Sequence, residues 1–298
     1  MATHLDWYGC ATFSLRTAGL TIFLDAYIDR PQGAEGTGLT ASDVTEADYL
    51  LIGHSHFDHL WGAERILENT DATLIGSYES VRVMEQAGVA LDRMICVAGG
   101  ETVALSDDVT VSVYPSQHSC VWSHAKMDEP DVVCLGDLGV TWQDQQQRMR
   151  ELMSYLSTET SQAVQNHLAE ASPGHSDRGD GGALVYLIEG PDGSILFQDS
   201  AGAWSGIFDT LNPDVAILAA AGRANIDGEP IQGSLAEFVA MEAAALKPKK
   251  LIYGHHDDWM PGFSIPVNTD AINTAVRQMH PSVEIIEPHY MESTEILP

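Results

Sequence analysis

Four side chains that can bind metal ions fall within six residues, in the segment HSHFDH at residues 54–59. His54 and His56 share one face of an extended chain, because residues i and i+2 point to the same side. Asp58 and His59 come where the chain turns into a helix, and from there they can reach a second metal. Neutral imidazole and carboxylate are ligands that zinc takes in proteins, so this spacing predicts a metal site.

Hydrophobic patterning predicts the elements that would position these side chains. Tyr49–Ile52 is a short apolar run that predicts a buried strand, and apolar residues at helical spacing follow the segment. Residues 5–14 and 20–25 cluster apolar residues on either side of a turn at Thr17-Ala18-Gly19, which predicts a β-hairpin. Other strands are expected at 110–114, 183–188, 194–198, 215–219 and 250–253, with one or two helices in 141–171 and a helix over 234–246. Strands mixed with helices throughout predict an α/β fold.

The sequence around the metal-binding segment resembles a known family. LLIGHSHFDHLWGAERI resembles the signature of the metallo-β-lactamase superfamily, and the resemblance covers nearly the whole chain. The opening WYGCATFSLRTAGLTIFLDAY resembles the first hairpin of the ascorbate-6-phosphate-lactonase-like branch of that family. PSQHS, FQDSAG and KPKKLIYGHH resemble its later motifs.

This resemblance implies a centre of two divalent metal ions. The implied ligands are His54, His56 and His118 for the first metal, and Asp58, His59 and His255 for the second. Asp199 would bridge the two metals, and either Asp58 or Asp199 could pass a proton to the leaving group. Two such ions about 3.5–4 Å apart can share one water and lower its pKa toward neutrality. We expect Zn²⁺, with Mn²⁺ and Fe²⁺ as alternatives, because these ions accept similar ligands.

Four further residues are candidates for the surroundings of the metals. In the family, the acidic residue that ends the second strand supports the metal site, and here this residue is Asp25. His256 is the alternative ligand on the closing strand. Arg223 follows a strand where family members place substrate loops, so it contacts an anion or forms a surface salt bridge. His124 comes shortly after His118 and lies either in the pocket or at the surface.

The fold implied by the resemblance is a four-layer αβ/βα sandwich with the metals at one edge, between the sheets. We expect a single domain over residues 1–298, with a helical and loop insertion at about 120–182 that covers the pocket. The glycine-rich end of this insertion, residues 172–182, is either a mobile lid or a solvated surface loop.

Charge and composition restrict the partners. The chain has 43 acidic and 14 basic residues, a formal net charge of −29, which repels nucleic-acid phosphates and anionic membranes. It shows no secretory signal and no apolar run near the roughly 20 residues of a membrane span. The four cysteines are scattered without a CxxC spacing, which favours reduced thiols in a cytoplasmic protein. We therefore expect a small-molecule substrate and no nucleic-acid or membrane partner, and a homo-oligomer is left open.

The predicted activity is hydrolysis of a small ester, with a lactone as the first choice, by a hydroxide held between the metals. The lactonase-like hairpin and the complete ligand set motivate this prediction. A phosphodiesterase is the rival within hydrolysis, because it shares these ligands and needs only a different pocket. An iron-dependent oxidoreductase similar to the sulfur dioxygenases of the superfamily is the alternative from another class.

Overall fold

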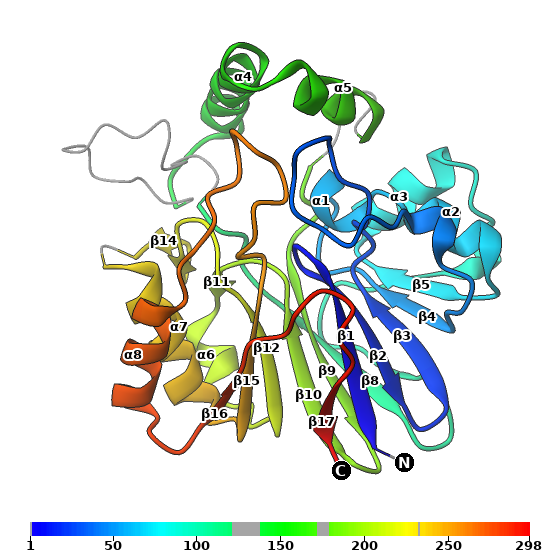
Figure 1. The fold of residues 1–298 in the computed structure, drawn as a ribbon, viewed down its shortest axis with the longest axis vertical. Coiled ribbons are helices and arrows are strands. Elements are labelled where there is room, and N and C mark those ends of the chain that lie inside the picture. Colours follow the sequence, from blue (N-terminus) through cyan, green and yellow to red (C-terminus); the bar gives the residue numbers. More distant parts are fainter. Residues whose placement is uncertain (1, 121–137, 172–178, 232) are drawn as a thin grey trace.

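Two seven-stranded sheets and a small three-stranded sheet make up the strands of the computed structural model, which describes residues 2–120, 138–171, 179–231 and 233–298 (Figure 1). In spatial order, the first sheet contains β17 (Thr294–Leu297), β1 (Thr3–Gly9), β2 (Thr12–Thr17), β3 (Leu20–Leu24), β4 (Tyr49–Leu51), β5 (Thr73–Gly76) and β6 (Met94–Cys96). The second contains β16 (Glu284–Ile286), β15 (Lys250–Gly254), β12 (Val215–Ala219), β10 (Gly193–Gln198), β9 (Leu184–Gly190), β8 (Thr110–Pro115) and β7 (Thr102–Ala104). The small sheet contains β11 (Gly202–Ala203), β13 (Asn225–Ile226) and β14 (Glu229–Pro230).

The helices divide into three groups by position. Those beside the first sheet are α1 (Phe57–Leu60), α2 (Ala63–Asn69) and α3 (Tyr78–Gln86), with the 3-10 turns η1 (Ala41–Asp43) and η2 (Leu91–Arg93). Those beside the second sheet are α6 (Ser205–Phe208), α7 (Leu235–Leu246) and α8 (Asp270–Met279). At one end of the molecule lie α4 (Trp142–Glu159) and α5 (Gln162–Ala171), as Figure 1 shows. None of the described helices is long and apolar enough to span a membrane.

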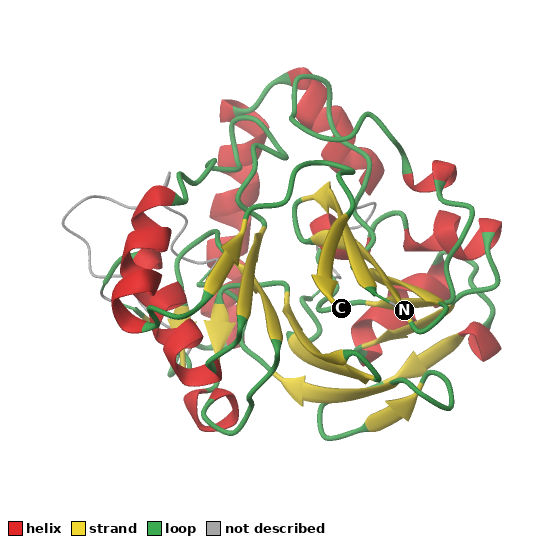
Figure 2. Ribbon diagram, turned by 60° about the horizontal axis from the view of Figure 1, so that its bottom comes forward, coloured by secondary structure: helices red, strands yellow, loops and turns green. Residues whose placement is uncertain are grey.

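Three buried clusters separate four layers. One cluster, which includes Phe13, Ile22 and Phe197, lies between the two sheets. A second packs the outer face of the first sheet against α2 and α3, and a third packs the second sheet against α7 and α8. Helices therefore cover both outer faces of the paired sheets, as Figure 2 shows. The expected four-layer αβ/βα sandwich is confirmed.

The pair α4 and α5 packs on the end of the sandwich through its own small core. Helix α4 begins at a capping box formed by Thr141 and Asp144, and its buried face presents Leu152 and Leu156. These side chains pack in a cluster with Tyr27 and with neighbours that include Trp259, Met260 and Leu168. The described part of the expected insertion at 120–182 thus contains two helices, whereas 121–137 and 172–178 lie outside the described residues.

The first strand differs from the expectation. Residues 5–14 are not one strand of a hairpin, because the chain turns within them and forms β1 and β2 on either side. Gly9 has a φ of 93° and Cys10 a φ of 49°, and this turn is hidden inside an apolar run. The expected turn at Thr17-Ala18-Gly19 does join two paired strands, β2 and β3. The correction places Cys10 at a sheet end instead of inside a strand.

Candidate metal centre

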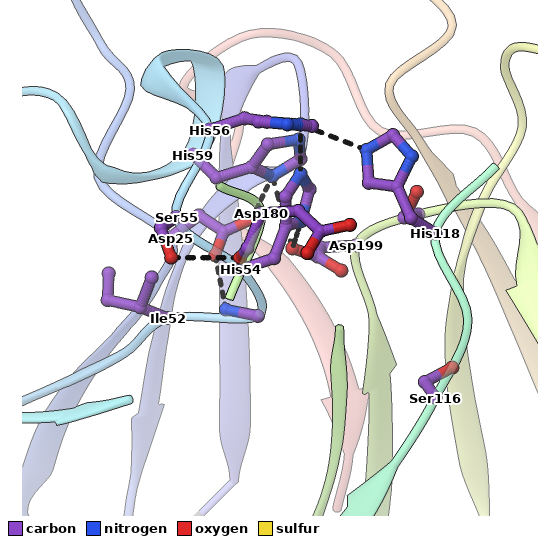
Figure 3. A network of polar contacts seen from close by, with 12 residues as sticks. Asp25, Ile52, His54, Ser55, His56, His59, Ser116, His118, Asp180 and Asp199 are labelled. Atoms are coloured by element: carbon purple, nitrogen blue, oxygen red, sulfur yellow. Dashed lines mark hydrogen bonds and ion pairs between the residues drawn. The ribbon is translucent and has the colours of Figure 1, made fainter. Parts of the chain in front are cut away.

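Four strand ends deliver the predicted ligands to one edge of the sandwich. His54 follows β4 in the first sheet, whereas His118, Asp199 and His255 follow β8, β10 and β15 in the second. Strands β10, β12 and β15 run parallel, so their carboxyl ends meet at the same edge. Helix α1 begins directly after His56, which is its N-cap residue. Ligands from segments far apart in the sequence therefore meet only in the folded chain (Figure 3).

The first ligand cluster consists of three imidazoles, joined by dashed lines in Figure 3. Nδ1 of His56 lies 3.1 Å from Nε2 of His54 and 3.1 Å from Nε2 of His118. One ligand atom from each ring lies within 4.8 Å of the others, an arrangement that suits a single divalent ion. Burial is the main reason that the pKa of His54 is well below its usual value and that the pKa of His56 falls to about 4. Both rings are therefore neutral, which is the form that binds metals.

The second cluster is centred on the carboxylate of Asp58. Its Oδ2 lies 3.5 Å from Nε2 of His59 and 3.4 Å from Nε2 of His255. Burial raises the pKa of Asp58, but the neighbouring His59 and the contacts with His255 outweigh it and hold the pKa well below the usual value. An ionised carboxylate between two imidazoles fits a second divalent ion.

The outer nitrogens of three histidines are held by oxygen acceptors. Nδ1 of His118 donates to the carbonyl oxygen of Ser119 at 2.7 Å, and Nδ1 of His59 donates to Oδ2 of Asp25 at 2.7 Å. Nδ1 of His54 donates to Oδ2 of Asp199 at 2.6 Å. These bonds assign the proton to Nδ1, which leaves Nε2 of each ring as the ligand atom. Such outer acceptors orient metal-binding histidines and make them more basic.

Asp25 supports the second cluster from behind. This fully buried residue follows β3 and has a φ of 57°, which turns its carboxylate toward the site. Oδ1 accepts from the backbone N–H of Gly53 at 2.9 Å, while Oδ2 binds His59. Burial and the charge of Asp199 raise the pKa of Asp25 to about 7, against the opposing effect of His59. The supporting role that the family resemblance implies for Asp25 stays a prediction.

Asp199 lies against His54 and His59. Its Oδ2 is 2.6 Å from Nδ1 of His54 and 3.2 Å from Nδ1 of His59, on the sides of these rings that face away from the ligand atoms. Asp199 also lines the cavity described below. Gly53 makes room for the carboxylate, since a Cβ at that position would lie 2.1 Å from Oδ2. The bridging role of Asp199 stays a prediction.

The other candidate residues have different surroundings. His256 stacks on Trp7 with ring centroids 4.8 Å apart, whereas its neighbour His255 faces Asp58. Arg223 lines the cavity, and its carbonyl accepts from the backbone N–H of Cys120 at 2.8 Å. His124 lies outside the described residues.

A cavity of about 740 Å³ opens onto both clusters. Predicted ligands line it, among them His118, Asp58 and His255. One face of α4 also lines the cavity and adds apolar side chains, with Met149 and Met153 among them. Such a volume lies within the range of about 300–1,000 Å³ that is typical of small-molecule sites.

A family model and the fold place this chain among known proteins. The model of a family described as "Beta-lactamase superfamily domain" matches residues 4–232. These residues include the opening hairpin, the segment 54–59, His118 and Asp199. The chain belongs to the metallo-β-lactamase superfamily. The closing motif with His255 lies beyond the matched residues, and the structure brings it to the same site as the other ligands.

Relatives within the superfamily share part of the sequence or all of the fold. A "UPF0173 metal-dependent hydrolase" of Caldivirga maquilingensis is 31% identical over 117 residues, 39% of this chain and 49% of that protein. The chain spans about half the length of the curated relatives it matches. A metallo hydrolase from Ignicoccus hospitalis has a TM-score of 0.63 at 15% identity, covering 99% of this chain and 98% of that one. CmlA, a diiron β-hydroxylase from Streptomyces venezuelae, has a TM-score of 0.60 at 17% identity, covering 99% and 54%. At 15% and 17% identity, the two structural neighbours show a shared metallo-β-lactamase fold alone.

Two residues at the centre were not among the predicted ones. The thiol of Cys10 groups with Asp58 and His255 within ligand distance. Asp180 lies beside the first cluster, where its backbone oxygen accepts from both N–H and Oγ of Ser55 at 2.8 Å (Figure 3). Both residues come from segments that carry no metal-binding spacing, so no local pattern could identify them.

Proposed function

We propose that this chain is a dinuclear metal-dependent hydrolase whose substrate is a carboxylic ester, with lactones as the favoured class. The observation that carries the proposal is that predicted ligands of both metals line one cavity and lie in groups close enough to hold an ion. The donor set of imidazoles and carboxylates suits Zn²⁺, with Mn²⁺ and Fe²⁺ as alternatives. Bound there, two divalent ions would activate water and polarise a carbonyl or phosphoryl oxygen.

The residues of the chain orient the ligands and receive protons. Asp25 and Ser119 fix the rings of His59 and His118, so that Nε2 of each faces the reaction site. Asp58 and Asp199 are the carboxylates in reach of a leaving group, since both line the cavity. A carboxylate at this position can pass a proton to an alkoxide that leaves the ester. In the proposal, Asp199 holds His54 through Oδ2 and would be the carboxylate shared by the two metals.

The cavity wall favours an ester with an apolar part. Helix α4 contributes Leu152 and Leu156 as well as the two methionines, and Phe263 packs in the same apolar cluster. Apolar walls of this kind bind the non-reacting part of a substrate, and a few polar groups orient the reacting part. Arg223 also lines the cavity and is a candidate contact for a carboxylate or other anion of the substrate. The net charge of −29 weakens the case for phosphodiesters of nucleic acids, because it repels them at long range.

A rate assay on two substrate classes tests this proposal. The metal-loaded chain is supplied in parallel with a lactone series of increasing alkyl length and with bis(p-nitrophenyl) phosphate. We expect lactone opening without phosphodiester cleavage, and loss of turnover by orders of magnitude in Asp199→Ala, whose fold is checked by circular dichroism. Phosphodiester cleavage alone would move the chain to the phosphodiesterases, and full activity of the variant would refute the role of Asp199.

Metal analysis separates hydrolysis from oxidation. The fold is shared with a diiron β-hydroxylase, so the identity of the metal has to be measured and not assumed. About two zinc or manganese ions per purified chain would support the hydrolase, since these sites act on bound water without redox chemistry. Iron as the only metal, together with oxygen consumption on addition of substrate, would contradict it.

A further inference from the structure

Cys10 brings a thiol to the second ligand cluster. The residue is fully buried in the turn between β1 and β2. Its Sγ and the ligand atoms of Asp58 and His255 all lie within 4.8 Å of one another. Sγ also lies 3.6 Å from the backbone oxygen of Asp58. A soft ligand atom is therefore present beside a carboxylate and an imidazole.

The backbone of Cys10 is fixed from both sides. Its N–H donates to the two carboxylate oxygens of Asp257 at 3.0 and 3.1 Å. Its carbonyl accepts from Nε1 of Trp7 at 3.0 Å and from the backbone N–H of His255 at 2.7 Å. These four bonds hold the turn rigidly, so the position of the thiol does not depend on a mobile loop.

Two residues of this cluster have a left-handed backbone. Cys10 has a φ of 49° and His255 a φ of 67°, and a hydrogen bond joins the two residues directly. Residues other than glycine adopt this conformation at an energetic cost, and they occur often at functional sites. Here the conformation brings both side chains to Asp58.

We propose that Cys10 is a ligand of the second metal, together with Asp58, His59 and His255. The inference rests on the proposed dinuclear centre and adds one sulfur to the oxygen and nitrogen donors of that metal. A thiolate binds zinc at about 2.3 Å and favours it over harder ions such as Mn²⁺.

Cobalt(II) titration of the metal-free full chain tests the inference, because a thiolate ligand adds a sulfur-to-cobalt charge-transfer band in the near ultraviolet. We expect this band to grow with one of two bound equivalents in the native chain. Cys10→Ser should abolish the band and weaken binding of that equivalent at least about 10-fold, the loss seen even for outer partners of ligands. Cys120→Ser and Cys96→Ser are the controls, one buried and one exposed, and should keep the band.

Cadmium NMR of the native chain gives a second measurement that needs no variant. One of two cadmium signals should lie far downfield, as sulfur ligation requires. Two signals in the nitrogen and oxygen range, or a cobalt band that survives Cys10→Ser, would overturn the role of Cys10 and leave the dinuclear centre intact. Failure of the native chain to bind two equivalents would overturn the proposed centre as well.

Discussion

Gly53 controls the position of Asp199 at the scale of a single residue. It lies between β4 and His54, and a Cβ there would overlap the carboxylate of Asp199. Gly53→Ala should therefore displace Asp199 from His54 and His59. We expect turnover to fall at least about 10-fold, because removal of partners that orient metal ligands has effects of this size. Metal content by elemental analysis and the rate on the preferred substrate measure the change.

Gly206 offers a matched control for this substitution. It lies in α6, and a Cβ there would meet no heavy atom within 4 Å. Gly206→Ala should leave metal content and rate unchanged, since alanine is also the better helix former. Native metal content and native rate in Gly53→Ala would show that Asp199 does not depend on this space.

At the same scale, the sequence predicted residues whose spacing is local. The segment 54–59 has four potential ligands within one strand end and one helical turn, and the structure brings all four to one edge. His118, Asp199 and His255 needed the family resemblance, because each stands alone in its own segment. Cys10 could not be predicted, since its position depends on a turn with positive φ and on hydrogen bonds to residues nearly 250 positions away.

At the scale of elements, the contact between β10 and α7 depends on a buried carboxyl group. Glu242 on α7 is 4% exposed, and its Oε1 accepts from Nε2 of Gln198 at 2.7 Å. Oε2 has no hydrogen-bond partner among the described residues. Burial raises the pKa of Glu242 well above its usual value, and the bond from Gln198 offsets this only in part. Gln198 directly precedes Asp199, so this contact also anchors the strand end at the metal centre.

Glu242→Gln should make the stability of the chain less sensitive to rising pH. Folding raises the pKa of this carboxyl group. Its contribution to the free energy of unfolding is therefore fully present below the unfolded pKa of about 4.5, and it is lost as the pH rises toward the folded pKa. Glutamine stays neutral at every pH. The urea midpoint of the variant minus that of the native chain should therefore increase as the pH rises above about 5. Glu284→Gln, at an exposed position on β16, is the control. An equal midpoint difference at every pH would contradict the prediction.

The elements show which patterns are reliable. Most apolar runs bounded by glycine or proline became the expected strands, such as β10 and β12, because a strand between two packed layers must be apolar on both faces. The division of residues 5–14 into two strands was missed, since an apolar run does not reveal a turn inside it. The packing of α4 and α5 over the strand ends also depends on tertiary contacts with Tyr27 and Trp259, which amphipathic spacing alone does not specify.

At the scale of the whole molecule, charge is the most unusual property. The chain has 43 acidic and 14 basic residues, so ion pairs such as Arg65 with Asp29 cannot neutralise most carboxylates. Like charges on a compact surface repel one another and favour the expanded chain. The layers of the sandwich, which the family resemblance predicted, are stabilised by apolar packing that has to overcome this repulsion.

We expect added salt to raise the thermal midpoint of unfolding by several degrees. The screening length falls from about 30 Å at 0.01 M to about 3 Å at 1 M ionic strength, so repulsion between distant carboxylates is removed over this range. Scanning calorimetry of the metal-loaded chain in NaCl and in tetramethylammonium chloride measures the shift. If screening is the cause, both salts act alike at equal ionic strength, and the shift is largest at low salt, where the screening length changes most. A midpoint that is flat in both salts would mean that the acidic residues are spaced widely enough for water alone to screen them.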